Sequence, residues 1–257
     1  MPRALWTGAS GMFAQQTNVD VIANNIANVN TVGFKRQRAN FQDLFYDVQV
    51  QPGAKASDLG RNPTGTQIGT GVKLSGTPRI FTAGNIEVTN NPTDLAIDGD
   101  GFFRITMPDG TSEAYTRAGD FRVDANGSLV TPDGYLVPGV SGIDPQLGPV
   151  SISSTGEVTQ GSSTRGQINL TRFANNAGLV GIGRNLFSET IASGAPEEVT
   201  PGSTGIGTIR SGALEKANVE VVTELVNLIV AQRAYEANSK SIQTSDQMLR
   251  TANEIIR

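Results

Sequence analysis

The chain has 257 residues and a formal net charge of -4 at pH 7, and 37% of its residues are hydrophobic and 17% charged. Both fractions lie below the usual globular averages, which indicates a lean core with many turns. Cysteine and histidine do not occur, which excludes disulfides, thiolate catalysis and cysteine-ligated metals and removes the commonest general base. No basic surplus favours nucleic acid, and we interpret the densest basic cluster, Lys35, Arg36 and Arg38, as a solvated patch.

Targeting signals are absent from the sequence pattern. The longest apolar run, Val219 to Ala231, is interrupted by polar residues such as Glu224, so we expect no membrane insertion. The N-terminus carries no apolar segment followed by an Ala-x-Ala site, so we expect no cleavable signal peptide. These features predict a cytoplasmic protein or one exported by a route that needs no such signal.

Glycine and proline divide the chain into three regions. Of 30 glycines and 12 prolines, four fall in the first 51 positions and none in the last 45. Because these residues interrupt helices and strands, we predict an α+β protein, with long terminal helices paired as a coiled-coil-like layer and a central, mainly antiparallel β domain. The predicted boundaries are 1–35 and 213–257 for a discontinuous helical domain, 36–75 for an extended or loop segment, and 76–212 for the β domain.

Apolar residues in the N-terminal segment recur every seven positions, and a second line joins the first. On a helix they form one narrow stripe with the coiled-coil period. Asparagine is frequent here and is a poor residue for a helix interior, so we expect this helix to need a partner. The stripe consists of Leu5, Met12, Val19, Ile22, Ile26 and Val29.

The middle of the chain reads as short strands between turns. Strands are expected at Phe102–Thr106, Tyr115–Val123 and Gly166–Phe173. Turns are expected at residues 108–110, 124–127 and 132–134, where proline or aspartate precedes a glycine that permits positive φ.

Three motifs in the middle region have part of the pattern of a binding or catalytic site. Asp98-Gly99-Asp100-Gly101 lacks the further ligands of a calcium loop. The glycines between Gly65 and Gly71 lack the Lys-Ser/Thr ending of a phosphate loop. The adjacent acids Glu197 and Glu198 lie in a loop-like stretch without aromatic neighbours. We therefore predict no catalytic residue, no cofactor and no metal site.

The C-terminal segment carries a longer stripe of the same period. A helix of about 40 residues would be roughly 60 Å long, which is more than so lean a core can cover. Small residues three positions further on, Ala231, Asn238, Ser245 and Ala252, allow a neighbouring backbone to approach closely. The stripe consists of Val221, Leu228, Tyr235, Ile242, Leu249 and Ile256, with Leu225 beside it.

Two interpretations of the stripes are open. The helices can pack on each other or on the β region within one molecule, or they can pair between molecules. Exposed apolar stripes of this length are costly in a monomer, so we favour contacts between subunits and take the stripe residues as candidate subunit-interface residues. The ends would then be mobile in the free subunit and fold on assembly.

Three long motifs follow one another along the chain. The first runs from Leu5 to Lys35, the second from Asp94 to Phe121, and the third from Val222 to Leu249. They resemble the N-terminal, central and C-terminal signatures of the bacterial flagellar axial proteins, the family of the basal-body rod and hook. Within it, Phe41–Ala54 and Pro63–Gly71 are similar to the stretch that distinguishes distal-rod members, whereas hook members are usually longer.

The resemblance implies a structural, non-enzymatic subunit of the distal rod. Such subunits polymerise into a helical, tubular drive shaft that transmits torque across the periplasm to the hook. The implied partners are further copies of the chain, other rod proteins, the hook protein, the ring bushing, the type III export apparatus and the rod cap. The implied location is the basal body, towards the outer membrane, after export without a cleavable signal.

Two alternatives remain open. One is a proximal rod or hook subunit of the same family. The other is a secreted β-rich enzyme or sugar-binding protein with oligomerisation helices. A sugar-binding cleft would need aromatic side chains around carboxylates, whereas the single tryptophan, Trp6, lies in the N-terminal segment.

Overall fold

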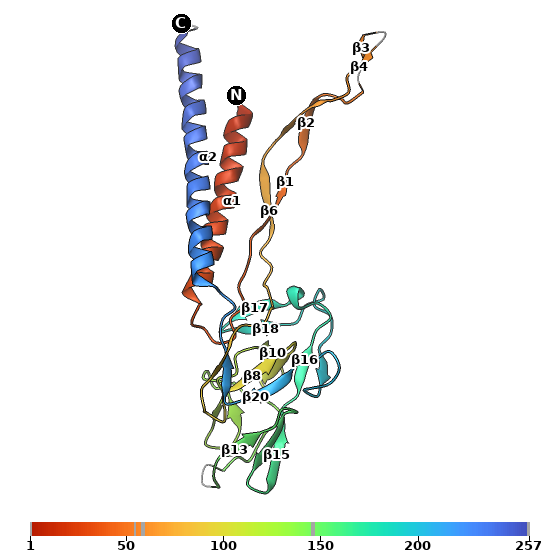
Figure 1. The fold of residues 1–257 in the computed structure, drawn as a ribbon, viewed down its shortest axis with the longest axis vertical. Coiled ribbons are helices and arrows are strands. Elements are labelled where there is room, and N and C mark those ends of the chain that lie inside the picture. The colour runs from red at the N-terminus through yellow and green to blue at the C-terminus, as the bar shows by residue number, and fades with distance from the viewer. Residues whose placement is uncertain (1, 54, 58–59, 145–146, 256–257) are drawn as a thin grey trace. The chain divides into compact units, whose positions relative to one another are not determined.

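The computed structural model describes residues 2–53, 55–57, 60–144 and 147–255 and divides into two compact units (Figure 1). One unit comprises Met1–Ile26, Gln37–Pro78 and Val221–Arg257, and it contains two long helices and a β arm. The other comprises Ala27–Arg36 and Arg79–Glu220 and is the β body. The predicted α+β class is confirmed.

Both terminal helices are present, over parts of the predicted ranges. Helix α1 spans Pro2–Ala27 and helix α2 spans Val221–Ile255. The chain after α1 leaves the helical conformation in a turn that ends at Gly33, whose φ is +66°. Before α2, strand β21 (Ala213–Glu215) pairs with β7 (Ile86–Val88), so these residues belong to a sheet and not to the helix.

The segment predicted as extended or loop forms a long antiparallel arm. At its base β1 (Asn40–Asp43) pairs with β6 (Val72–Gly76). Further out β2 (Tyr46–Val50) pairs with β5 (Thr66–Gly69), and β3 (Lys55–Ser57) pairs with β4 (Gly60–Arg61). Figure 1 shows these pairs following one another along a single narrow ribbon.

The body is built around a six-stranded antiparallel sheet. Its strands, in spatial order, are β17 (Val180–Gly183), β18 (Leu186–Ser188), β10 (Glu113–Thr116), β9 (Phe102–Thr106), β16 (Leu170–Arg172) and β19 (Glu197–Val199).

Smaller antiparallel groups complete the body. A three-stranded sheet contains β13 (Val150–Ile152), β14 (Glu157–Gln160) and β15 (Ser163–Gln167). Strand β20 (Thr208–Ser211) pairs with β8 (Leu95–Asp98), and β11 (Arg122–Val123) pairs with β12 (Leu129–Val130). A short 3₁₀ helix, η1, spans Asn176–Gly178.

The central strands are buried on both faces of the sheet. Successive side chains of a strand point to opposite faces, and in β9 both Phe102 and Phe103 are fully buried. Phe103 belongs to the larger core and meets Phe121 edge to face, with ring centroids 5.1 Å apart. Phe102 belongs to a smaller aromatic cluster and meets Phe173 at 5.8 Å. The body therefore has its own core.

The three predicted turns are confirmed. The amides of Gly110, Gly127 and Gly134 each donate to the carbonyl three residues earlier, at 2.9 Å, and all three glycines have positive φ. The predicted strand Phe102–Thr106 is also confirmed as β9.

Two other strand predictions are wrong in extent. The region Tyr115–Val123 is divided, because β10 ends at Thr116 and β11 begins only at Arg122. The region Gly166–Phe173 is also divided, because β15 ends at Gln167 and β16 begins at Leu170. Between them the amide of Ile168 donates to the carbonyl of Gly156 at 2.8 Å, outside either ladder.

Candidate functional site

The two helices contact each other through small residues. Helix α1 approaches α2 so closely that a Cβ on Gly8 would lie 2.8 Å from Cγ1 of Ile242, and one on Gly11 would lie 2.7 Å from Nδ2 of Asn238. Ala231 and Ser245 of α2 are also buried. The close backbone approach predicted for the small positions of the C-terminal segment is confirmed at Asn238.

Several large apolar side chains of both helices are exposed. On α2 the exposed residues Val222, Val226, Ile229 and Val230 follow the spacing of one helix face. On α1 the exposed aromatic residues Trp6 and Phe13 lie seven positions apart, which also places them on one face. These two helices therefore leave a set of large apolar side chains exposed to the solvent.

The predicted interface residues fall into three groups. Ile22 is buried, and Val221, Leu225 and Tyr235 are exposed. Ile256 lies outside the described residues. The other predicted residues are half-buried. Val29 follows the end of α1, and the rest lie on the two helices: Leu5, Met12, Val19, Ile26, Leu228, Ile242 and Leu249.

A groove runs between the two helices beside Tyr235. Its volume is about 540 Å³, and its walls come from Gln16 and Val19 of α1 and from Gln232, Tyr235 and Glu236 of α2. A lining that combines apolar side chains with amide and carboxylate groups suits packing against a further helix of mixed polarity.

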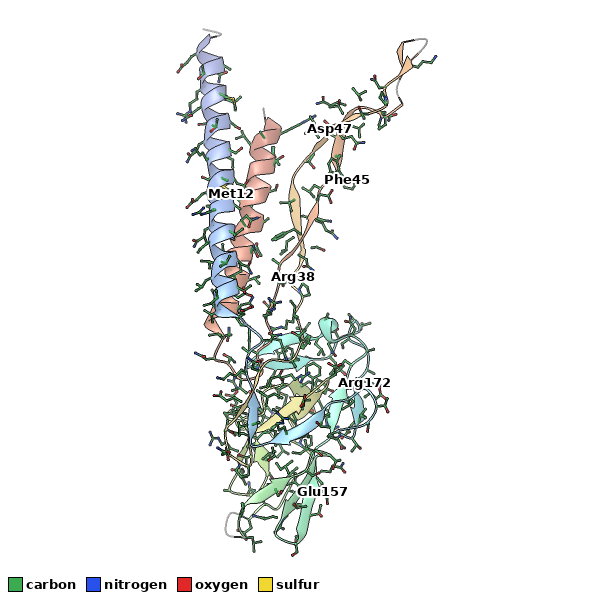
Figure 2. The ribbon with its side chains drawn as sticks, in the orientation of Figure 1. Met12, Arg38, Phe45, Asp47, Glu157 and Arg172 are labelled. Carbon is green, nitrogen blue, oxygen red and sulfur yellow. The ribbon has the colours of Figure 1, made fainter. Side chains whose placement is uncertain are left out.

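The arm exposes apolar side chains on a ribbon that is only two strands wide. Phe45 is 92% exposed, and Tyr46, Val48 and Ile68 are exposed as well. Figure 2 shows Phe45 and Asp47 on the outer part of this ribbon. A two-stranded ribbon is only marginally stable by itself in water, so these side chains are available for contacts that would support it.

The arm is attached to α1 by polar contacts. The amide of Val72 donates to Oγ of Ser10 at 3.3 Å, and Arg3 forms an ion pair with Asp47. Asn25, buried near the end of α1, holds the base of the arm. Its Nδ2 donates to the carbonyl of Gln37 and its Oδ1 accepts the amide of Gln37, both at 2.9 Å.

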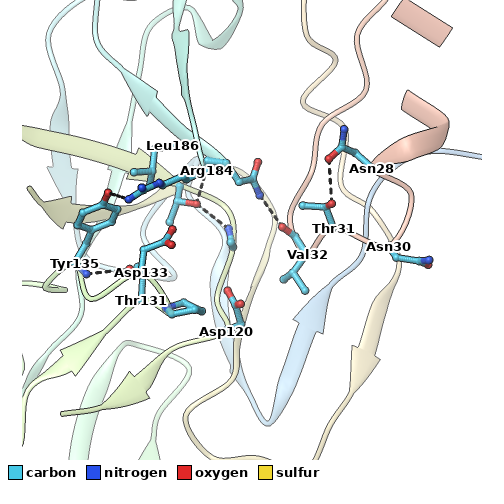
Figure 3. Close-up of a pocket in the computed structure, with 14 residues that line it drawn as sticks. Asn28, Asn30, Thr31, Val32, Asp120, Thr131, Asp133, Tyr135, Arg184 and Leu186 are labelled. Atoms are coloured by element: carbon cyan, nitrogen blue, oxygen red, sulfur yellow. Dashed lines mark hydrogen bonds between the residues drawn. The ribbon is translucent and has the colours of Figure 1, made fainter. Parts of the chain in front are cut away.

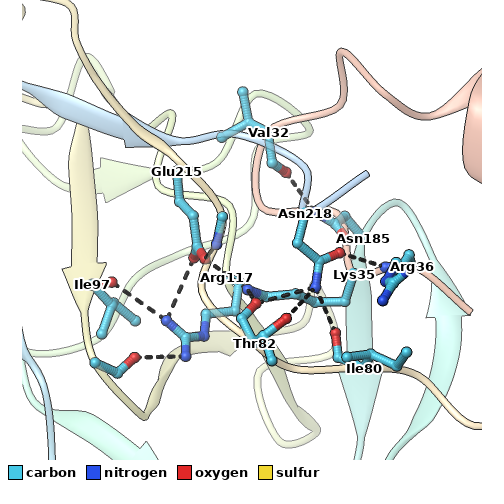
Figure 4. A network of polar contacts seen from close by, with 12 residues as sticks. Val32, Lys35, Arg36, Ile80, Thr82, Ile97, Arg117, Asn185, Glu215 and Asn218 are labelled. Carbon is cyan, nitrogen blue, oxygen red and sulfur yellow. Dashed lines mark hydrogen bonds and ion pairs between the residues drawn. The ribbon is translucent and has the colours of Figure 1, made fainter. Parts of the chain in front are cut away.

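Within the body, a fully buried ion cluster joins three distant segments (Figure 4). Nζ of Lys35 lies 2.6 Å from Oε1 of Glu215 and donates to the carbonyl of Thr82 at 2.8 Å. Oε1 of Glu215 also accepts the amide of Gly84 at 2.8 Å. Burial lowers the pKa of Lys35, and the charge of Glu215 opposes that shift.

Arg117 is the second cation of this cluster. Its Nη1 lies 3.4 Å from Oε2 of Glu215, and its Nη2 donates to the carbonyl of Gly99 at 2.7 Å. The guanidinium also lies over the ring of Phe102, 5.6 Å from the centroid. Burial lowers the pKa of Arg117, and Glu215 and Asp100 oppose that shift.

The cluster corrects one prediction from the sequence. The basic run at positions 35–38 was interpreted as a solvated patch, yet Lys35 is fully buried. Glu215 and Arg117 were not singled out from the sequence. The available signal was only that Lys35 and Arg117 lie inside two of the three motifs that carry the family resemblance, and no local pattern relates either of them to Glu215.

A cavity of about 480 Å³ lies in the body beside the segment that follows α1 (Figure 3). Asp120 lines it, and burial, helped by the nearby charge of Asp94, raises the pKa of this carboxyl. On the opposite wall Arg184 donates to the hydroxyl of Tyr135. The side-chain amide of Asn185 donates to the carbonyl of Val32 at 2.6 Å, which fixes the wall to the N-terminal segment.

The described residues hold no cluster of three or more Asp, Glu, His or Cys side chains placed to bind a metal ion. Across the same residues, no helix combines the length and the apolar character needed to cross a membrane.

Comparison with known proteins identifies the family. The family model described as "Flagella basal body rod protein" matches residues 5–35. "Flagellar hook protein FlgE/F/G D1 domain" matches residues 96–160, and "Flagellar basal body rod FlgEFG protein C-terminal" matches residues 210–255. These matches overlap the three motifs that carry the resemblance.

Full-length relatives agree with the family models. The flagellar basal-body rod protein FlgG of Borreliella burgdorferi is 50% identical, and the match covers 100% of both chains. The FlgG of Caulobacter vibrioides is 49% identical over 98% of this chain and 99% of its own length. The rod protein FlgF of Caulobacter vibrioides is 37% identical over 99% of this chain and 98% of its own length.

The chain therefore belongs to the flagellar basal-body rod proteins, and it shares more identity with these FlgG relatives than with the FlgF relative. Members of this family are structural proteins, so the prediction of a non-enzymatic rod subunit is confirmed.

Proposed function

We propose that the chain polymerises with further copies of itself into the helical tube of the distal rod and so transmits torque across the periplasm to the hook. A drive shaft needs head-to-tail contacts that do not close into a small ring. The observation that carries the proposal is that large apolar residues of α1 and α2, such as Trp6, Phe13 and Val222, remain exposed although the two helices already contact each other.

The exposed apolar surface supports contacts between copies. A monomer gains nothing from Trp6, which is 75% exposed, or from Phe13 and Val222, which are exposed to a similar degree. Burying such side chains in a neighbouring subunit would contribute about 1.5–3 kcal/mol each. In this proposal the exposed and half-buried stripe residues and the groove beside Tyr235 form the inter-subunit contact, with the helices paired as a coiled-coil-like layer.

The arm supplies a second contact surface in the proposal. Phe45 and Tyr46 would pack on a neighbouring copy, because an isolated ribbon needs a further partner to become rigid. The remaining partners follow from the family: other rod proteins, the hook protein, the ring bushing, the rod cap and the flagellar export apparatus. The proposed location is the periplasmic part of the basal body.

Electron microscopy of the purified full-length chain, concentrated from dilute solution, tests the proposal. Because Trp6 is the single tryptophan, the emission of the same sample reports whether this side chain becomes buried. Circular dichroism measures the helix content. We expect tubes of constant diameter, a blue shift of the Trp6 emission and a gain in helix. Since a rod subunit can require a template, purified rod ends are added as seeds in a second arm.

One outcome contradicts the proposal directly. If the chain stays monomeric and helical at high concentration, with and without seeds, the exposed stripes do not drive polymerisation. A dimer that stops growing would also count against it, because a closed dimer cannot extend into a shaft.

A further inference from the structure

The ion cluster of the body joins residues that lie far apart in the chain. Lys35 precedes Glu215 by 180 positions, and Arg117 precedes it by 98. All three side chains are almost completely inaccessible to water, with exposed fractions of 0%, 1% and 2% for Lys35, Glu215 and Arg117. The cluster contains two cations and one carboxylate, so Glu215 is the group on which both cations depend.

Backbone contacts place the two terminal segments of the body against each other at the same point. The amide of Gly33 donates to the carbonyl of Glu215 at 2.7 Å. Nδ2 of Asn218 donates to the carbonyl of Ile80 at 2.8 Å, and its Oδ1 accepts the amide of Arg36 at 2.8 Å. Residues 32–36 and residues 213–218 therefore share one docking site on the body.

Docking of either segment alone leaves the cluster incomplete, although Glu215 without Lys35 still keeps its contact with Arg117. If residues 213–218 are absent, Lys35 and Arg117 lie together in a dry site without the carboxylate that pairs with both. If residues 32–36 are absent, Glu215 loses its ion pair with Lys35 and the backbone bond from Gly33. Removing one member of a buried ion pair is far more costly than removing an exposed one.

We propose that the Lys35–Glu215–Arg117 cluster is an interlock that makes the docking of residues 32–36 conditional on the docking of residues 213–218, and the reverse. The coupling must be equal in both directions, because linkage between two equilibria is reciprocal. Each segment continues directly into a terminal helix, so the two stretches of chain that lead to the helices become ordered together.

The interlock concerns the folded monomer and is independent of the proposed polymerisation. A chain that never forms tubes can still show it, and a chain that forms tubes can lack it. If both hold, a chain that lacks residue 215 does not order residues 32–36, which follow helix α1, before it meets a growing assembly.

Amide hydrogen exchange of the full-length monomer, resolved by segment, tests the interlock. In the variant Glu215→Gln we expect residues 32–36 to exchange roughly 150- to 4,000-fold faster, the factor that corresponds to an uncompensated buried charge. In the variant Lys35→Met we expect residues 213–218 to exchange faster too, but by a smaller factor, because Glu215 keeps its contact with Arg117. The amides around Phe103, deep in the core, serve as the internal reference and stay protected.

A matched control lies next to the cluster. Lys216 pairs with Glu87 at 2.6 Å, but both side chains are 57% exposed. The variant Lys216→Met should change exchange in either segment by no more than about 5-fold. The triple variant Lys35→Met, Arg117→Met, Glu215→Met leaves no buried charge, so it should regain at least about tenfold of the lost protection.

Three results would overturn the interlock. The first is unchanged protection of residues 32–36 in Glu215→Gln. The second is a triple variant as unprotected as the single variants, which would assign the effect to packing and not to charge. The third is loss of protection at the core amides in both single variants, which would make the cluster a general stability element of the whole body.

Discussion

The exposed face of α2 allows a quantitative test of assembly. Val226 and Val230 are 54% and 61% exposed, so together they leave slightly more than one whole valine side chain in water. Burying one such side chain fully contributes about 1.5–3 kcal/mol. The double substitution Val226→Ser, Val230→Ser should therefore cost about 2–3.5 kcal/mol for each subunit that joins the polymer.

This loss of free energy raises the protein concentration at which tubes form. Each 1.4 kcal/mol corresponds to about a tenfold change in an equilibrium constant. The double variant should therefore need roughly 20- to 300-fold more protein than the unchanged chain before tubes sediment. Sedimentation over a concentration series measures this threshold, and circular dichroism of the supernatant checks that the helices remain, since serine and valine have similar helix propensity.

The control for this experiment is Ile191→Ser. Ile191 is completely exposed but belongs to the body, the other compact unit, and its substitution should leave the threshold unchanged. An equal threshold for the double variant would refute the reasoning. Loss of helix in its monomer would refute it as well, because the valines would then stabilise the helix pair itself.

The body gives further predictions, each measured by thermal unfolding. Gly33→Ala should lower Tm, because φ is +66° and the new Cβ would lie 2.5 Å from the carbonyl carbon of Arg117. Backbone strain of this kind costs about 1–3 kcal/mol. An unchanged Tm would contradict this prediction. Phe103→Ala removes a fully buried ring and should lower the free energy of unfolding by about 3–5 kcal/mol. A decrease below about 1 kcal/mol would show that neighbouring side chains move in to fill the cavity. Asp120→Asn should raise Tm at pH 7. The pKa of Asp120 is raised by burial and by Asp94, so its contribution to stability is full below the usual aspartate range and is lost as pH rises through the raised pKa. The gain should therefore vanish in acid, and a gain that is independent of pH would exclude this cause.

The turns and helices were predictable because their causes are local. Gly127 and Gly134 mark turns through the conformations that they permit, and this information lies within four residues. The helix stripes are likewise visible as a period. Leu228 and Ile242 were identified by that period, but the period alone does not tell which partner covers them, and the structure leaves both half-buried.

The ion cluster was not predictable because its causes are distant. In the sequence Lys35 stands beside Arg36 and near Arg38, which is the usual pattern of a solvated patch. Its burial depends on Glu215, 180 positions later. A buried lysine is distinguished from an exposed one only by its partner, and a single sequence contains no local trace of that partner.

The uneven placement of small and large residues explains why the two units differ. Gly8 and Gly11 lie in the interior of α1, where each glycine costs about 1 kcal/mol relative to alanine. They let α2 approach closely, while Trp6 and Phe13 remain in water. The helix pair thus leaves large apolar side chains uncovered, whereas the body has a closed aromatic and aliphatic core. In the proposed assembly, the apolar burial that stabilises the helices and the burial that joins the subunits are one and the same, so ordering of the ends and growth of the polymer occur together.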